Sequence, residues 1–139
     1  MILGFTGTHK GMTPAQKAGV GRFMRRFDGI DFHHGKCIGA DYEAWQIAQD
    51  HFFITFAHPS NILRTQAATY DKWTAKPLPP LARNKSLVAT IDVLLATPKE
   101  YKEQLRSGTW MTIRAARKRN IQVIIIFPDG TKREEEANI

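Results

Sequence analysis

Residues 91–127 read IDVLLATPKEYKEQLRSGTWMTIRAARKRNIQVIIIF, and this stretch decides the fold class. It opens with an apolar run at residues 91–96 and closes with a second one at residues 121–127, which is the most apolar run of the chain. Residues 108–119 lie between the two runs and are interpreted as an amphipathic helix. Continuous apolar strands joined by such helices indicate a parallel sheet that is covered on both faces.

The same alternation extends toward the N-terminus. Residues 2–5, 29–34 and 52–56 are interpreted as further strands, and residues 13–27, 40–49 and 81–90 as helices. Thr13, Pro14 and Gln16 form the expected start of the first helix, because Thr13 can act as N-cap and Gln16 can close a capping box. We therefore predict an α/β protein, a single Rossmann-like three-layer domain with a mainly parallel five-stranded sheet.

Size and composition fit one globular domain. The chain has 139 residues, of which 42% are hydrophobic and 24% are charged, and this length accommodates one core but not two. No apolar run reaches the roughly 18 residues that span a bilayer, and the opening MILGFTG does not resemble a secretory signal. With a single cysteine, Cys37, no internal disulfide can form. We expect a cytoplasmic protein without a membrane partner.

Two segments depart from the alternating pattern. Residues 58–80 are long, contain four prolines and lack clear periodicity. Long irregular connections are often functional, so a lid over a site and a connection along the surface both stay open. We expect residues 1–130 to form the nucleotide-binding domain and residues 131–139 to be a flexible tail.

The formal net charge of +7 favours an anionic partner. Part of this charge is a run near the end of the last predicted helix, formed by Arg114, Arg117, Lys118 and Arg119. Such a run is more often a solvated helix end than a nucleic-acid surface. A nucleotide or nucleotide-derived small molecule is the partner that we expect, and nucleic acid is a further candidate.

Glycine and hydroxyl residues follow three of the predicted strands. In an open parallel sheet the ligand crevice lies at the carboxyl ends of the strands, where glycine allows close backbone approach and helix N-termini suit phosphate. Each motif alone also fits a simple turn or N-cap, but together they predict one phosphate-binding crevice. The candidate positions are Thr6, Gly7 and Thr8, then Gly35, Gly39, Ala40 and Asp41, and finally Ser107, Gly108 and Thr109.

Four segments, GFTGTHKG, HHGKCIGADYEAWQIA, LARNKSLVATIDVLLATP and RSGTWMTIRAARKRNIQVIII, resemble the successive motifs of the SLOG superfamily. The resemblance is strongest to its small YspA-like bacterial and phage proteins, and more distant to DNA-processing protein A and the Lonely Guy phosphoribohydrolases. It implies nucleotide binding and a homo-oligomer. It further implies that Gly35 and Gly39 cradle phosphate, that Asp41 caps its helix or accepts from a ribose hydroxyl, and that Arg83 binds phosphate while Asn84 orients a base or sugar.

Whether the chain is an enzyme stays open. The motif typical of Lonely Guy enzymes is P-G-G-x-G-T-x-x-E, with a glutamate just inside the helix. Residues 107–112 of this chain read SGTWMT and contain no acid. A nucleoside-monophosphate N-glycosidase would therefore need Asp41, Asp92 or Glu43 in place of that glutamate. The segment SGTWMTIRAARKRNIQV instead looks like part of DNA-processing protein A, which makes a single-stranded DNA-binding module the second alternative.

The histidines follow no spacing typical of a metal site. We expect neither a metal nor a cofactor, and no catalytic residue can be assigned from the sequence. His9, in the first loop, and His34, at a strand end, are candidates for contacting phosphate.

Overall fold

The computed structural model describes residues 1–27 and 29–137. Within these residues, seven strands form one sheet in the order β4-β3-β2-β1-β5-β6-β7. All neighbouring strands run parallel except β6 and β7, which are antiparallel. The strands are β1 (Ile2–Gly7), β2 (Asp31–His34), β3 (Ile54–Ala57), β4 (Trp73–Thr74), β5 (Val93–Thr97), β6 (Gln122–Ile126) and β7 (Lys132–Glu135).

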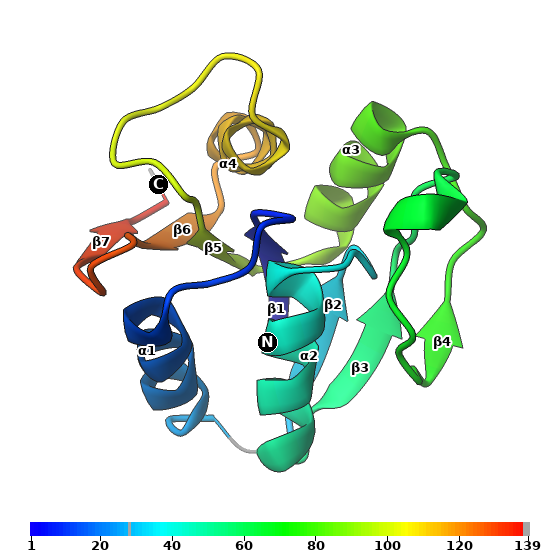
Figure 1. The fold of residues 1–139 in the computed structure, drawn as a ribbon, viewed down its shortest axis with the longest axis horizontal. Coiled ribbons are helices and arrows are strands. Elements are labelled where there is room, and N and C mark those ends of the chain that lie inside the picture. The colour runs from blue at the N-terminus through cyan, green and yellow to red at the C-terminus, as the bar shows by residue number, and fades with distance from the viewer. Residues whose placement is uncertain (28, 138–139) are drawn as a thin grey trace.

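Helices cover both faces of this sheet, so the predicted α/β class and three-layer arrangement are confirmed. Figure 1 shows α1 and α2 on one face and α3 and α4 on the other. The helices are α1 (Pro14–Met24), α2 (Ala40–Asp50), α3 (Pro80–Thr90) and α4 (Gly108–Lys118), with a short 3-10 turn, η1, at Leu63–Thr65. No helix in the described residues is long and apolar enough to cross a membrane.

The N-terminal cap of α1 forms as the sequence predicts. The Thr13 hydroxyl accepts a hydrogen bond from the Gln16 backbone N–H at 3.0 Å, and the Gln16 side chain accepts one from the Thr13 N–H at 3.0 Å. The Gln16 amide also donates to the carbonyls of Pro98 and Ile126. The start of α1 is therefore tied to the ends of β5 and β6.

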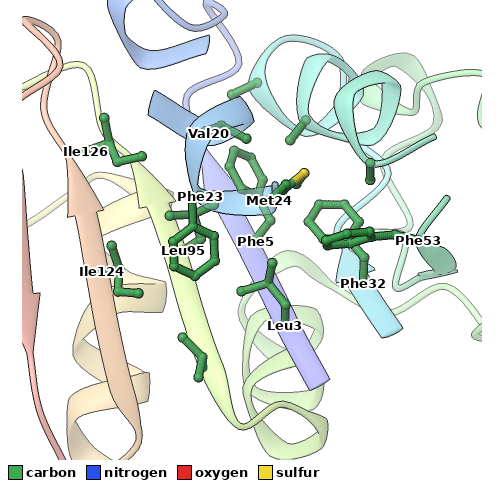
Figure 2. Close-up of a cluster of buried hydrophobic side chains, with 14 of the residues drawn as sticks. Leu3, Phe5, Val20, Phe23, Met24, Phe32, Phe53, Leu95, Ile124 and Ile126 are labelled. Carbon is green, nitrogen blue, oxygen red and sulfur yellow. The ribbon is translucent and has the colours of Figure 1, made fainter. Parts of the chain in front are cut away.

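The apolar character of the central strands follows from their burial on two faces. Alternate residues of β5 enter opposite clusters: Leu95 packs beneath α1 and α2, and Leu94 packs beneath α3 and α4. Ile124 and Ile125 of β6 divide in the same way. Figure 2 shows the first cluster, in which residues from β1, β2, β5 and β6 meet residues from α1.

The predicted sheet of five strands is wrong, because two more strands lie at its edges. β4 falls within residues 58–80, which we expected to be irregular, and its two residues are too few to show any alternation. β7 falls within the expected tail; its residues Lys132–Glu135 are all charged and largely exposed, because an edge strand can lie with both faces in solvent.

The strand order creates a switch point at β1. The chain runs from β1 outward to β4 on one side and returns to β5 on the other side, so β1 pairs with both β2 and β5. In open α/β sheets, ligand crevices form where the direction of the strand order reverses, at the carboxyl ends of the strands. The fold therefore directs attention to the segments that follow β1 and β5.

Candidate functional site

A cavity of about 500 Å³ lies at the carboxyl ends of β1 and β5. Its walls come from the end of β1 and the loop after it, the turn after β2, one side of α3, and the segment that joins β5 to α4. This volume is in the range of pockets that hold small organic ligands. Of the sequence-predicted residues, those that line it are Thr6, Gly7, Thr8, Gly35, Asp41, Arg83, Asn84, Ser107, Gly108 and Thr109.

Gly39 and Ala40 belong to the predicted set but do not line the cavity. Gly39 adopts φ 85°, and a Cβ added to it would overlap the backbone of His9. The Ala40 N–H donates to the Thr8 carbonyl at 3.0 Å. The start of α2 is therefore closed by the loop that follows β1, and its glycine is needed for that packing.

The start of α4 is open to the cavity. Ser107 is the N-cap, and its hydroxyl accepts from the Trp110 N–H at 3.2 Å. The N–H groups of Gly108 and Thr109 have no hydrogen-bond acceptor among the residues that the structure describes. A Cβ added to Gly108 would meet no atom within 4 Å. This helix end presents free donors and the positive end of its dipole to the cavity.

Arg83 forms the inner wall of the cavity and is 9% exposed. Its Nη1 donates to the Gly35 carbonyl at 2.7 Å and to the His58 carbonyl at 3.3 Å, and its Nε donates to Asn84 Oδ1 at 2.8 Å. These oxygens are uncharged. Among the described residues, no carboxylate lies within 4.0 Å of the guanidinium. Arg83 is thus a nearly buried cation without a bonded counter-charge.

Asp41 lines the cavity near Arg83. A Cβ on Gly35 would lie 2.5 Å from Arg83 Nη1 and 2.7 Å from Asp41 Oδ2, so the glycine leaves room for both groups. Asp41 Oδ2 accepts from the Cys37 N–H at 3.3 Å. Burial raises the pKa of Asp41 above its ordinary value, although Arg83 acts in the opposite direction. Burial, followed by the effect of Asp41, raises the pKa of the Cys37 thiol to about 12, so this thiol is not an activated nucleophile.

Several lining residues were not in the predicted set. Lys10 follows β1, and Lys99, Glu100, Gln104 and Arg106 lie between β5 and α4. The signal that could have identified them is position alone, because every residue between a strand end and the next helix is a candidate in this fold. Glu100 Oε1 accepts a hydrogen bond from the Trp110 indole N–H at 3.1 Å. Lys10, Lys99 and Arg106 are exposed cations at the cavity.

The histidine expectations divide. His9 lines the cavity. His34 does not, and the expectation that it contacts phosphate is wrong: it is fully buried, and its Nε2 lies 2.7 Å from Asp71 Oδ1. No group of three or more His, Cys, Asp and Glu residues that could hold a metal ion occurs in the described part of the chain.

Two of the four cations in the basic run at the end of α4 are paired with carboxylates. Glu103 accepts from both Arg114 and Arg117, at 2.9 and 2.8 Å. Arg117 also forms two hydrogen bonds to Glu135 of β7, at 2.7 and 2.8 Å. These contacts favour the interpretation of the run as a solvated helix end over that of a nucleic-acid surface.

Comparison with known proteins places the fold. No protein-family profile and no curated protein sequence matches the chain. Solved structures do match it. The molybdenum cofactor binding protein of Rippkaea orientalis superposes with a TM-score of 0.71 at 22% identity, over 91% of this chain and 76% of that one.

DNA processing protein A gives two further matches. The protein from Streptococcus pneumoniae has a TM-score of 0.68 at 16% identity, over 89% of this chain but only 49% of its own. The protein from Helicobacter pylori, described with a single-stranded DNA binding mode, has a TM-score of 0.61 at 18% identity, over 99% of this chain and 68% of its own. The chain therefore shares the fold of these proteins, and DNA-processing protein A is one of the groups that its sequence motifs resemble.

Proposed function

We propose that the cavity binds a nucleotide or a nucleotide-derived anion and that the protein acts as a binding or sensing domain for it. One observation carries the proposal: Arg83 is a nearly buried cation that lines the cavity and has no bonded carboxylate among the described residues. A buried charge is costly unless an opposite charge or strong hydrogen bonds compensate for it. The hydrogen bonds of Arg83 and its interaction with Asp41 offset part of this cost. An anionic ligand in the cavity would add a directly bonded counter-charge.

The surrounding groups fit phosphate in particular. The free N–H groups of Gly108 and Thr109 suit an anion at a helix start. Lys10, Lys99 and Arg106 add positive charge around the same cavity. Asp41 and Asn84 offer hydrogen-bonding groups of the kind that a ribose or a base requires. The ligand class is therefore a phosphate joined to a polar, hydroxyl-bearing group.

An N-glycosidase is the second candidate function, and the position of Asp41 favours it. Of the three acids considered from the sequence, Asp41 alone lines the cavity. Asp92 accepts from the Ile2 N–H at the start of β1, and Glu43 is paired with Lys17 at 2.9 Å. A buried carboxyl with a raised pKa is suited to general-acid catalysis near neutral pH. Release of free base from a nucleoside monophosphate would establish turnover.

The test is calorimetric titration with AMP, GMP, CMP, UMP and inorganic phosphate, with the products analysed by chromatography. We expect one or more of the nucleotides to bind more tightly than phosphate. Arg106→Gln and Lys99→Gln should each weaken binding about threefold to tenfold at low salt, because each removes an exposed cation beside the ligand. Lys118→Gln and Arg119→Gln remove the same charge from exposed positions at the end of α4 and provide the controls.

The two pairs of variants separate a local site from general attraction by net charge. Equal weakening by all four substitutions would contradict a phosphate site in the cavity. Absence of binding by every nucleotide would remove the proposed function altogether.

Homo-oligomerisation, which the resemblance implies, also stays a proposal. An exposed apolar side chain near the cavity supports it, since Leu105 follows the cavity-lining Gln104 and is 82% exposed. Light scattering at several protein concentrations measures the mass directly. A monomer at every concentration would contradict it.

A further inference from the structure

A buried hydrogen-bond network joins residues 58–80 to the turn that follows β2. His34 Nε2 lies 2.7 Å from Asp71 Oδ1, and both side chains are fully buried. The Lys36 backbone N–H donates to His34 Nδ1 at 3.0 Å. Because His34 Nδ1 accepts this hydrogen bond, it carries no proton. The proton is therefore on Nε2, and a neutral His34 donates to the Asp71 carboxylate.

The carboxylate of Asp71 is compensated through Thr69. The Thr69 hydroxyl donates to Asp71 Oδ2 at 2.7 Å. The same hydroxyl accepts from Lys36 Nζ at 2.9 Å, and the Thr69 carbonyl accepts from this ammonium at 3.0 Å. Lys36 and His34 flank Gly35 in the chain, so both neighbours of Gly35 are bonded into one network that ends at Asp71.

Backbone hydrogen bonds extend the same connection. The Ala67 N–H donates to the Lys36 carbonyl at 2.8 Å, and the Ile38 N–H donates to the Thr65 carbonyl at 2.9 Å. The His58 N–H donates to the His34 carbonyl at 2.8 Å. Residues 58–71 are thus bonded to β2 and its turn at several points, and Figure 1 shows the segment beside the β2–β3 side of the sheet.

This turn holds Arg83. The guanidinium Nη1 donates to the Gly35 carbonyl at 2.7 Å and to the His58 carbonyl at 3.3 Å. Gly35 follows His34 in the chain, and the His58 backbone N–H donates to the His34 carbonyl. Both acceptors of Arg83 therefore depend on the position of His34. A displacement of the turn would move the acceptors of Arg83 and with them the cation that lines the cavity.

We propose that Asp71 is a positioning residue for the ligand cavity: through His34 and Thr69 it fixes the Gly35 turn, and through the Gly35 carbonyl it fixes Arg83. This role rests on the proposed function, because positioning matters only where Arg83 meets a ligand. Residues 58–80 then act as a fixed support of the cavity wall. Within this segment Pro80 lines the cavity, and Asp71 does not. Asp71 therefore acts on the cavity through His34, Thr69 and the Gly35 turn.

The test compares Asp71→Ala with Asp71→Asn in the full chain. Alanine removes both acceptors and leaves the buried His34 N–H without a partner, whereas asparagine can still accept from His34 through its amide oxygen. We expect the dissociation constant for the tightest of AMP, GMP, CMP and UMP to rise about tenfold in Asp71→Ala and less in Asp71→Asn. Partial recovery by the conservative variant is the signature of positioning.

A second measurement does not depend on a ligand. The ¹⁵N signals of the His34 ring report its tautomer, and the Arg83 Nε–H signal reports how firmly the guanidinium is held. In Asp71→Ala we expect the single Nε2–H tautomer to be lost and exchange of the Arg83 Nε–H to become faster. If the wild-type protein binds none of the four nucleotides, the proposed function fails, while this measurement still decides whether Asp71 positions Arg83.

Matched controls exclude a general loss of stability. Asp129→Asn removes an exposed carboxylate that bonds only within its own turn to Thr131. Phe53→Leu weakens the core beneath α2, away from the cavity. If Asp71→Ala does not fold, Thr69→Val, which breaks the link from Lys36 to Asp71, takes its place beside Asp71→Asn. Unchanged Arg83 Nε–H exchange together with unchanged affinity in the folded variants would overturn the proposal.

Discussion

The starts of α2 and α4 both contain a glycine at the carboxyl edge of the sheet, and they differ in structure. Gly39 is the N-cap of α2, and Gly108 is the first residue of α4 after the N-cap Ser107. Gly39 of α2 has φ 85° and packs against His9, and the neighbouring Ala40 N–H is occupied by Thr8. Gly108 of α4 has open space around it and free N–H groups beside it.

The difference shows that a glycine at a helix start serves either of two needs. At α2 the absence of a side chain lets two loops of the protein touch. At α4 it leaves the helix end accessible to a ligand. The closed start supports the cavity wall through Cys37 and Asp41, and the open start contributes donors to the cavity itself. If this division holds, a side chain added at the start of α2 should cost stability, and one added at the start of α4 should cost ligand affinity.

Gly39→Ala should be the most damaging substitution. The backbone conformation of Gly39 disfavours an L side chain, and the added Cβ would overlap the His9 backbone, which has little freedom to move. We expect a loss of about 3 kcal/mol or more in the free energy of unfolding, from backbone strain and overpacking together. Urea denaturation followed by circular dichroism measures it. A folded variant that loses less than about 1 kcal/mol would show that the start of α2 is not closed in the way described.

Two buried histidines on the α3 side of the sheet, His33 and His58, give stability a pH dependence. His33 Nδ1 lies 2.7 Å from His58 Nε2 in the interior. The His58 backbone N–H donates to the His34 carbonyl. Burial first, and then the neighbouring His33, lower the pKa of His58 to about 4. Burial also lowers the pKa of His33. Both imidazoles are therefore neutral in the folded chain at neutral pH.

The sign of the pH effect follows from these directions. Between pH 6.5 and about 4 the unfolded chain binds protons that the folded chain does not, so stability falls as the pH falls through this window and is highest above it. The raised pKa of Asp41 opposes part of the loss, because protonation relieves its buried charge. We expect a net decrease on the order of 2 kcal/mol from pH 7 to pH 4.5.

Urea denaturation at several pH values measures this slope, and His58→Phe should flatten it whatever its effect on stability at pH 7. His51→Gln, at the C-terminal end of α2, is the control and should keep the wild-type slope. An unchanged slope in His58→Phe would assign the acid sensitivity to other groups.

The difference between the two helix starts could not be predicted from the sequence, whereas most of the fold could. The fold class, the four helices and the five strands other than β4 and β7 follow from apolar periodicity and capping residues, because these patterns are local consequences of burial. β4 and β7 carry no such pattern, since two residues are too few and KREE lies at an exposed edge.

For the candidate site, the sequence predicts which loops meet but not which side chain each loop turns inward. Nothing in the string GADYEA distinguishes a helix start that is blocked by His9 from one that is open. The partner of His34 is likewise 37 residues away in the chain, in a segment without periodicity. Contacts of this kind depend on tertiary packing, which no local pattern encodes.

Ser107→Ala should have a smaller effect on stability than Gly39→Ala. The Ser107 hydroxyl caps the Trp110 N–H, and no side-chain cap is present at the start of α2. Loss of such a cap costs about 1 kcal/mol. We expect this decrease in urea denaturation. A loss of 3 kcal/mol or more, beyond what a cap supplies, would mean that the start of α4 is packed as tightly as that of α2.

Gly108→Ala should have the smallest effect on stability and still affect binding. The added methyl group would meet no protein atom within 4 Å, and alanine reduces the conformational freedom of the unfolded chain, so the free energy of unfolding should stay equal or rise by about 0.5 kcal/mol. The same methyl group would stand beside the free N–H groups that line the cavity, so we expect nucleotide affinity to fall severalfold.

Gly21→Ala is the matched control, because Gly21 lies in α1, has equally open surroundings and does not line the cavity. Gly21→Ala should raise stability by about 0.5 to 1 kcal/mol and leave affinity unchanged. If Gly108→Ala matched Gly21→Ala in both measurements, the start of α4 would be open without taking part in binding, and the contrast with α2 would be one of packing alone.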